Sequence, residues 1–142
     1  MTPVLVKSNG SFRNEVVAGT HTFVIDEPPT AGGTDDGPTP YDLLGAALGG
    51  CTSMTLHFFA KREHIPLERV EVSVVNDRMY AKDCADCLTT SGYIHRFSVA
   101  IKLIGEQLTA EHREKLMAIA RRCPVYKTLT NEIRIDELLA AG

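Results

Sequence analysis

The chain has 142 residues, of which 44% are hydrophobic and 23% charged, and its formal net charge is -3. This length suits one domain with a substantial core. The small negative charge and the lack of a Lys/Arg block argue against nucleic acid or an anionic membrane as a partner. No segment approaches the roughly 18 apolar residues of a membrane span. The N-terminus has no basic region followed by an apolar one, so we expect no signal peptide and a cytoplasmic location.

The first part of the chain, residues 3–27, predicts β-structure. Three short runs are rich in β-branched residues: PVLVKS, FRNEVVAG and HTFVIDE. The Asn9-Gly10 pair between the first two runs is a signal for a tight hairpin turn, and Gly19-Thr20 separates the second run from the third. Residues 28–38 are rich in Pro, Gly and Asp and predict a loop that leads to the first helix.

The next stretch, TPYDLLGAALGGCTSMTLHFF, predicts a long helix from about Pro40 to His64. Thr39 is a favourable N-cap, and Asp42 stands where a capping box places its acid. The residues that recur at helical spacing on one face are Leu44, Ala47, Leu48, Cys51, Thr55 and Phe58. Because the helix is apolar nearly all round, we expect it to be buried at the centre of the fold.

Two glycines, Gly49 and Gly50, directly precede Cys51. Each costs about 1 kcal/mol relative to Ala inside a helix. The pair therefore indicates that another backbone approaches the helix closely at this point.

A long hairpin follows the first helix. Leu67–Tyr80 and Tyr93–Gly105 alternate as two antiparallel strands do, and the polar residues 82–92 form the hairpin tip. The tip carries Cys84 and Cys87 in a CxxC motif, which supplies only half the ligands of a structural zinc site. We therefore expect no bound metal there. The alternatives are a redox-active pair and two idle exposed thiols.

The last part of the chain predicts a second helix. Thr109 caps it, its apolar stripe ends at Cys123, and Pro124 interrupts it before a short helical turn restarts. Glu132–Ile135 predicts a final strand. The order βββ-α-ββ-α-β predicts an α+β fold with an antiparallel sheet and two long helices, in a single domain over residues 1–142.

Two cysteines on the packing faces of the predicted helices raise the question of thiol chemistry. On composition alone, Cys51 is most simply a small core hydrophobe. Cys123 precedes Pro124 at the start of a helical turn, with Arg121 and Arg122 beside it, and such an electropositive setting lowers a thiol pKa. Two buried helices that each present a cysteine could bring the thiols together, which is the alternative to an inert core cysteine. Without an export signal, catalytic, metal-binding or inert thiols are favoured over structural disulfides.

The segments around these cysteines, GPTPYDLLGAALGGCTSMTL and RRCPVYKTL, resemble the two signature segments of the OsmC/Ohr family of osmotically inducible and organic-hydroperoxide-resistance proteins. The order of strands and helices also fits, so the resemblance covers nearly the whole chain. It implies an OsmC-like fold, an intertwined homodimer with interface active sites, and a thiol peroxidase without a cofactor. By this resemblance an organic hydroperoxide oxidises the peroxidatic Cys51 to a sulfenic acid, the resolving Cys123 condenses it to a disulfide, and a dithiol reduces that disulfide.

The family mechanism also uses a cation beside the thiolate and an acid that orients the cation. The family's acid lies ten residues before the first cysteine, where this chain has Tyr41, and the nearest acid is Asp42. Asp42 stands roughly 13 Å along the helix from Cys51. If it takes part in the chemistry, it therefore acts on the partner's thiol. The alternative role is the capping box with Thr39, and both roles can hold at once. Arg13, the one arginine before the first helix, lacks the family's local pattern and is either the cation or a solvated strand charge.

Three functions compete at this stage. The first is a dithiol-dependent peroxidase that acts on organic hydroperoxides in oxidative-stress defence. The second is a non-catalytic protein of the same fold, which senses oxidation or binds a small ligand between Cys51 and Cys123. The third is a metal-binding protein built around Cys84 and Cys87.

Overall fold

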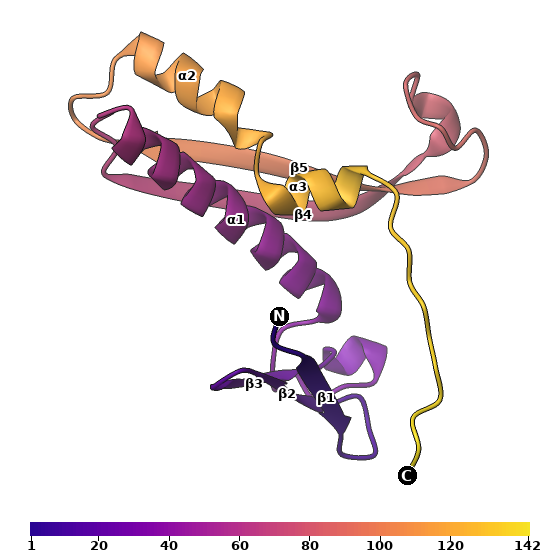
Figure 1. The fold of residues 1–142 in the computed structure, drawn as a ribbon. Coiled ribbons are helices and arrows are strands. Elements are labelled where there is room, and N and C mark those ends of the chain that lie inside the picture. The colour runs from indigo at the N-terminus through magenta and orange to yellow at the C-terminus, as the bar shows by residue number, and fades with distance from the viewer. The chain divides into compact units, whose positions relative to one another are not determined.

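The computed structural model describes all residues, 1–142, and they form two compact units, residues 1–46 and residues 47–142. In the first unit, β1 (Val4–Ser8), β2 (Asn14–Ala18) and β3 (His21–Ile25) make an antiparallel sheet in the order β1-β2-β3 (Figure 1). The tight turn is at Gly19-Thr20, because Ala18 pairs with His21. The hairpin predicted at Asn9-Gly10 is present, but its turn is not tight, since the five residues 9–13 connect β1 to β2.

The loop after β3 is folded around one buried carboxylate. Asp26 is 2% exposed, and its oxygens accept hydrogen bonds from the Thr34 hydroxyl at 2.8 Å and from the backbone N–H groups of Glu27, Thr34 and Asp36. These bonds, led by that of the Thr34 hydroxyl, hold the pKa of Asp26 at about 2. A Cβ on Gly33 would collide with the Glu27 carbonyl oxygen, so the tight path of this loop requires glycine there.

The first helix, α1 (Pro40–Arg62), begins as the sequence predicts. Thr39 N donates to Asp42 Oδ2 at 2.9 Å, and Asp42 N donates to Thr39 Oγ1 at 3.2 Å, which confirms the capping box. The helix ends two residues before the predicted His64.

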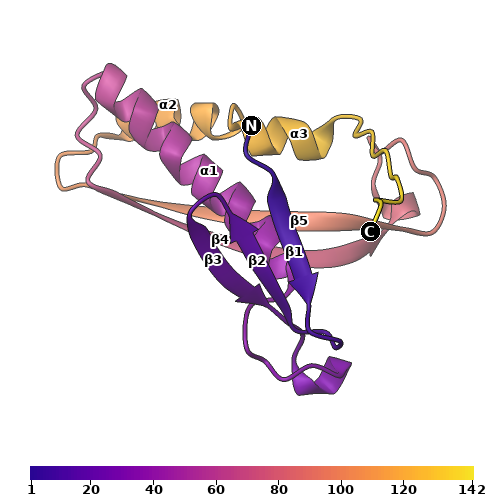
Figure 2. The same ribbon diagram turned by 60° about the horizontal axis from the view of Figure 1, so that its bottom comes forward.

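The second unit is built on a long hairpin, β4 (Arg69–Tyr80) and β5 (Tyr93–Ile104), paired antiparallel from Arg69–Ile104 to Tyr80–Tyr93. The helices α2 (Ala110–Ala120) and α3 (Pro124–Thr130) lie with α1 on the same face of this ribbon (Figures 1 and 2). The two strands, the hairpin tip, the Thr109 cap and the restart of the helix at Pro124 are confirmed.

The core of the second unit lies where α1, α2 and the hairpin meet. Its buried members are Leu56, Ala60, Ile65, Leu103, Leu116, Ile119 and Ala120. Arg113 Nη1 donates to the Leu103 carbonyl oxygen at 2.9 Å and so ties α2 to β5. A Cβ built on Gly49 would lie 3.4 Å from Val74 Cγ2, which shows that α1 packs closely on the side chains of β4.

Only one side of α1 is buried within the single chain. Its buried residues are Leu48, Gly49, Thr52, Leu56 and Ala60. Met54 and Phe58, by contrast, are 74% and 70% exposed. The predicted inward face, which included Phe58, is therefore rotated relative to the observed one, and Gly50 has no neighbour within 4 Å of a Cβ position. An all-round apolar helix does not by itself reveal which side the rest of the chain covers.

Three further expectations need correction. Glu132–Ile135 is not a strand, and residues 131–142 contain no helix or strand. The antiparallel strands make two sheets, one of three strands and one of two. By length and composition α1 is long and apolar enough to cross a membrane, so the expectation that no segment approaches a span was wrong on those criteria; core helices of soluble proteins meet them too.

Candidate active site

The two cysteines that the helices were expected to bring together do meet. Cys51 on α1 and Cys123 at the start of α3 are in hydrogen-bond contact through their sulfurs, and both are free thiols. Cys51 is half-buried, whereas Cys123 is completely buried. The pair therefore combines one partly exposed cysteine with one that is completely buried.

Cys123 is the N-cap of α3, and Tyr126 N donates to its Sγ at 3.4 Å. Burial acts to raise the pKa of the Cys123 thiol, but hydrogen bonds from the Cys51 thiol, the Tyr126 N–H group and Thr52 outweigh it, so the pKa is lowered. The direction agrees with the prediction made from the helix start at Pro124. Cys123 is thus the sulfur of the pair that more readily carries the negative charge.

The pKa of the Cys51 thiol is shifted in the opposite direction. Burial raises the pKa of the Cys51 thiol, and so does its hydrogen bond to Cys123, because the S–H group of Cys51 serves as the donor. The backbone N–H of Val125 and the hydroxyl of Thr55 partly compensate. Of the two thiols, Cys51 therefore holds its proton more strongly, with its S–H group as the donor toward Cys123.

Two threonines complete the surroundings of the sulfurs, and the sequence analysis missed their role. Thr55 stands four residues after Cys51 on the same face of α1, so helical spacing was a usable signal. Thr52 is 3% exposed, and its single hydroxyl proton is shared between Cys123 and the Leu48 carbonyl oxygen, which lies 2.8 Å from the hydroxyl oxygen. Its approach to Cys123 carries no such signal, because the two residues are far apart in the sequence.

A hollow of about 270 Å³ lies beside the pair. Thr52 and Tyr126, which hydrogen-bond to Cys123, both line it, and Arg121 contributes the positive charge in its lining. Its complete lining is Leu48, Thr52, Phe97, Val99, Ile101, Met117, Ala120, Arg121 and Tyr126. Most of these side chains are apolar, so the hollow suits an organic molecule with an alkyl or aromatic portion.

The two charged candidates from the sequence lie in the first unit. Asp42 is held by its capping box with Thr39. Arg13 belongs to the connection between β1 and β2 rather than to a strand, and its Nε donates to Asp36 Oδ2 at 3.1 Å. Both groups thus have partners within residues 1–46.

Cys84 and Cys87 stand apart from this pair. They form a disulfide in the hairpin tip beyond β4 and β5. Neither sulfur belongs to the group of residues around Cys51 and Cys123. The sequence left a redox-active pair and two idle thiols open, and the structure joins the two sulfurs.

Comparison with protein families gives one match, to the OsmC-like protein family over residues 33–137. The chain belongs to the OsmC-like family. The matched region contains Cys51, Cys123 and the whole hairpin. A comparison with curated proteins finds no match.

Solved structures of OsmC-like proteins share the fold. The OsmC-like protein of Mycoplasma pneumoniae matches with a TM-score of 0.71 at 18% identity, over 91% of this chain and 86% of that one. An organic hydroperoxide resistance protein OsmC of Legionella pneumophila matches with a TM-score of 0.66 at 20% identity, over 92% and 89%. The organic hydroperoxide resistance protein OhrB of Bacillus subtilis gives 0.62 at 20% identity, over 92% and 90%. At these identities the likeness establishes the fold.

Proposed function

We propose that this OsmC-like chain is a thiol peroxidase that reduces organic hydroperoxides with a dithiol as the reductant. The observation that carries the proposal is the contact between the partly exposed Cys51 and the buried Cys123. A two-cysteine peroxidase needs this division, because the substrate must reach one sulfur and the other must wait beside it. The names of the solved relatives from Legionella and Bacillus support organic hydroperoxides as the substrate class.

In the proposed reaction, the Cys51 sulfur attacks the terminal oxygen of the hydroperoxide and the O–O bond breaks. The alcohol leaves with a proton, and Cys51 becomes a sulfenic acid. The Cys123 thiolate then attacks the Cys51 sulfur and displaces hydroxide, which leaves as water, so that a disulfide forms. A dithiol reduces this disulfide through two exchange steps and is itself oxidised to a disulfide.

We assign the peroxidatic role to Cys51 although Cys123 has the lowered pKa. Cys123 is fully buried, so a hydroperoxide has no path to its sulfur, whereas Cys51 is half-exposed. The proton that Cys51 donates toward Cys123 provides a route to the reactive form, because its transfer along that hydrogen bond makes the Cys51 thiolate. The same charge distribution suits Cys123 as the group that later attacks the sulfenic acid.

We also propose that the chain acts as a homodimer in the cytoplasm, with its two units functioning as one domain. Large apolar side chains exposed in the single chain support a partner, among them Met54 and Phe58 on α1. In such a dimer, Asp42 and Arg13 are the candidates for the acid and the cation beside the partner's thiol. Light scattering that gives the mass of a single chain would contradict this part of the proposal.

The experiment is peroxide consumption with cumene hydroperoxide and dithiothreitol or dihydrolipoamide, on the wild type, Cys51→Ser and Cys123→Ser. We expect turnover in the wild type, none in Cys51→Ser, and about one equivalent of peroxide consumed by Cys123→Ser, because its sulfenic acid cannot be resolved. A disulfide between Cys51 and Cys123 should appear in the oxidised wild type. If Cys51→Ser keeps its turnover while Cys123→Ser loses it, the two roles are reversed.

A second function is favoured by the two charged groups. Arg13 is paired with Asp36, and Asp42 is occupied by its capping box. A site whose candidate cation and acid from the sequence are both engaged elsewhere suits a protein that registers oxidation, or binds a small ligand in the hollow, without turnover. Formation of the disulfide in the absence of sustained peroxide consumption would select this function over the peroxidase.

A further inference from the structure

The Cys84–Cys87 disulfide takes no part in the proposed peroxidase, and it sits on a well-built support. The hairpin ends in a neck where Tyr80 and Tyr93 stack with ring centroids 4.6 Å apart. Arg78 lies over the Tyr93 ring and Lys82 over the Tyr80 ring, and Ala81 N donates to the Gly92 carbonyl oxygen at 2.8 Å. Residues 84–87 therefore lie at the tip of the hairpin, outside the hydrophobic core of the second unit.

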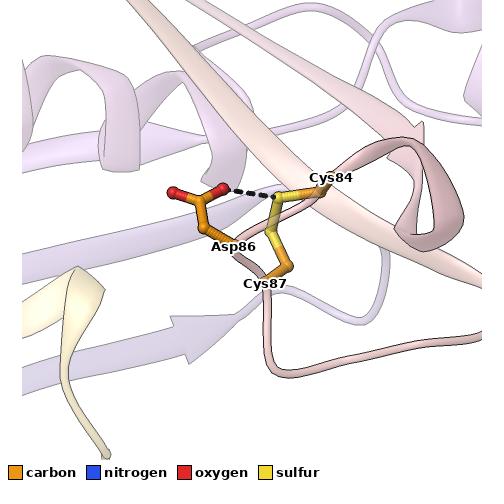
Figure 3. A group of neighbouring side chains, drawn as sticks. All are labelled: Cys84, Asp86 and Cys87. Carbon is orange, nitrogen blue, oxygen red and sulfur yellow. Dashed lines mark hydrogen bonds between the residues drawn. A yellow bond between two sulfur atoms is a disulfide. The ribbon is translucent and has the colours of Figure 1, made fainter.

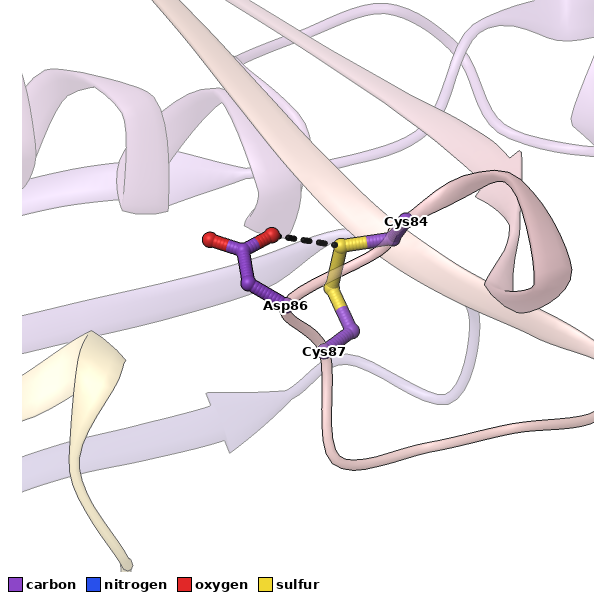
Figure 4. The surroundings of a disulfide bond; sticks show 3 residues. All are labelled: Cys84, Asp86 and Cys87. Atoms are coloured by element: carbon purple, nitrogen blue, oxygen red, sulfur yellow. Dashed lines mark hydrogen bonds between the residues drawn. A yellow bond between two sulfur atoms is a disulfide. The ribbon is translucent and has the colours of Figure 1, made fainter.

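Three metal-ligating groups converge at this end. The ligand atoms of Cys84, Asp86 and Cys87 all lie within 4.8 Å of one another. Asp86 Oδ1 is 3.5 Å from Cys84 Sγ, a contact that Figure 3 marks with a dashed line. The Cα atoms of the two cysteines are 5.4 Å apart, and Figure 4 shows the disulfide with Asp86 beside it. Small movements of the side chains would suffice to place both sulfurs and the carboxylate around one ion.

The Cys84–Cys87 disulfide contributes little to the stability of the fold. It closes a loop of four residues, and a cross-link over so short a loop removes little entropy from the unfolded chain. It also lies outside the hydrophobic core of the second unit. A structural role therefore does not account for the pair.

The charges around the pair distinguish between the remaining roles. Asp83 and Asp86 adjoin the cysteines, with Lys82 as the nearby cation in the sequence. Carboxylates repel a thiolate anion, which works against a nucleophilic cysteine. The same carboxylates attract a divalent cation, whose charge the thiolates would further offset.

We propose that, once the disulfide is reduced, Cys84, Cys87 and Asp86 bind a thiophilic divalent cation such as Zn²⁺, with the fourth position left to water. The CxxC spacing is one that zinc sites use, and two thiolates with a carboxylate are ligands that zinc accepts. Two sulfurs bound at about 2.3 Å in a tetrahedral site lie roughly 3.8 Å apart. The bonded sulfurs of the disulfide cannot adopt that separation, so oxidation closes the site and reduction opens it.

The redox step that opens the site is ordinary thiol–disulfide exchange. A thiolate of a small dithiol attacks one sulfur of the pair and forms a mixed disulfide, and its second thiol then displaces the cysteine. Two electrons pass to Cys84 and Cys87, and the reductant leaves as its own disulfide. The two thiols release their protons when the cation binds.

The test uses the full chain with Cys51→Ser and Cys123→Ser, so that Cys84 and Cys87 are the cysteines that remain. Circular dichroism verifies that this variant is folded. One sample is reduced with a phosphine, which does not compete for metal as a dithiol does, and the other is left oxidised. Zn²⁺ binding is measured by competition with a chromophoric chelator, and Cd²⁺ binding by thiolate-to-metal absorption in the ultraviolet.

We expect one ion per reduced chain and none per oxidised chain. In this background Asp86→Ala should weaken binding by roughly tenfold or more, since even outer partners of metal ligands contribute that much. Asp83→Ala is the matched control, because it removes the same charge next to Cys84 from a residue outside the ligand group. Equal binding by oxidised protein, equal losses from Asp83→Ala and Asp86→Ala, or no binding by the reduced protein would each overturn the proposal.

Discussion

A substitution of Leu116 tests the packing of α2 on α1 and the hairpin. This packing brings Cys123 close to Cys51. Its side chain is completely buried in the core of the second unit. Leu116→Ala removes three carbon atoms, which at about 0.8 kcal/mol each costs roughly 2.4 kcal/mol. The unfilled cavity raises this cost toward about 5 kcal/mol. For 142 residues the entropy of unfolding is about 0.3 kcal/mol/K, so Tm should fall by roughly 8 to 17 °C.

The assay is thermal unfolding followed by circular dichroism, with all variants at one protein concentration so that any dimerisation contributes equally. Met117→Ala is the matched control, because Met117 is the next residue along α2 but is 47% exposed. We expect the control to lose far less stability than Leu116→Ala. Equal losses for the two variants, or less than about 1 kcal/mol for Leu116→Ala, would refute the observed docking of α2.

Four further predictions concern other parts of the chain. The pKa of Asp26 is about 2 instead of 3.8, so the ionised carboxylate stabilises the fold fully above pH 3.8, and this stabilisation is lost as the pH falls toward 2. The free energies of unfolding of the wild type and Asp26→Asn, measured with urea, should therefore converge near pH 2. Gly33→Ala should destabilise the chain by about 1 to 3 kcal/mol in the same assay, because its Cβ meets backbone. Gly50→Ala should stabilise it by up to about 1 kcal/mol, and a loss of stability instead would mean that a second chain covers this side of α1. Thr52→Val should raise the pKa of Cys123, measured by thiolate absorption against pH, and an unchanged titration would contradict the hydrogen bond.

Much of the site was accessible from local sequence signals. The capping box at Thr39 and Asp42 and the restart of the helix at Pro124 both depend on neighbours within one helical turn. The two signature segments likewise indicated the OsmC-like family, which the family match confirms. Each of these features is decided by residues close together in the chain, so their physical causes can be recognised without a fold.

The features that the sequence did not determine depend on contacts between distant segments. Whether Phe58 or Leu56 faces inward depends on how α1 meets β4 and α2, because an all-round apolar helix has no polar side to mark its exposed face. The sequence predicted that two cysteines would meet, but only the packing of α3 against α1 decided which sulfur is exposed and which is charged. The sequence did not indicate that the buried Thr52 lies beside Cys123, for the same reason. The register between two helices is a tertiary property, and no periodicity within either helix encodes it.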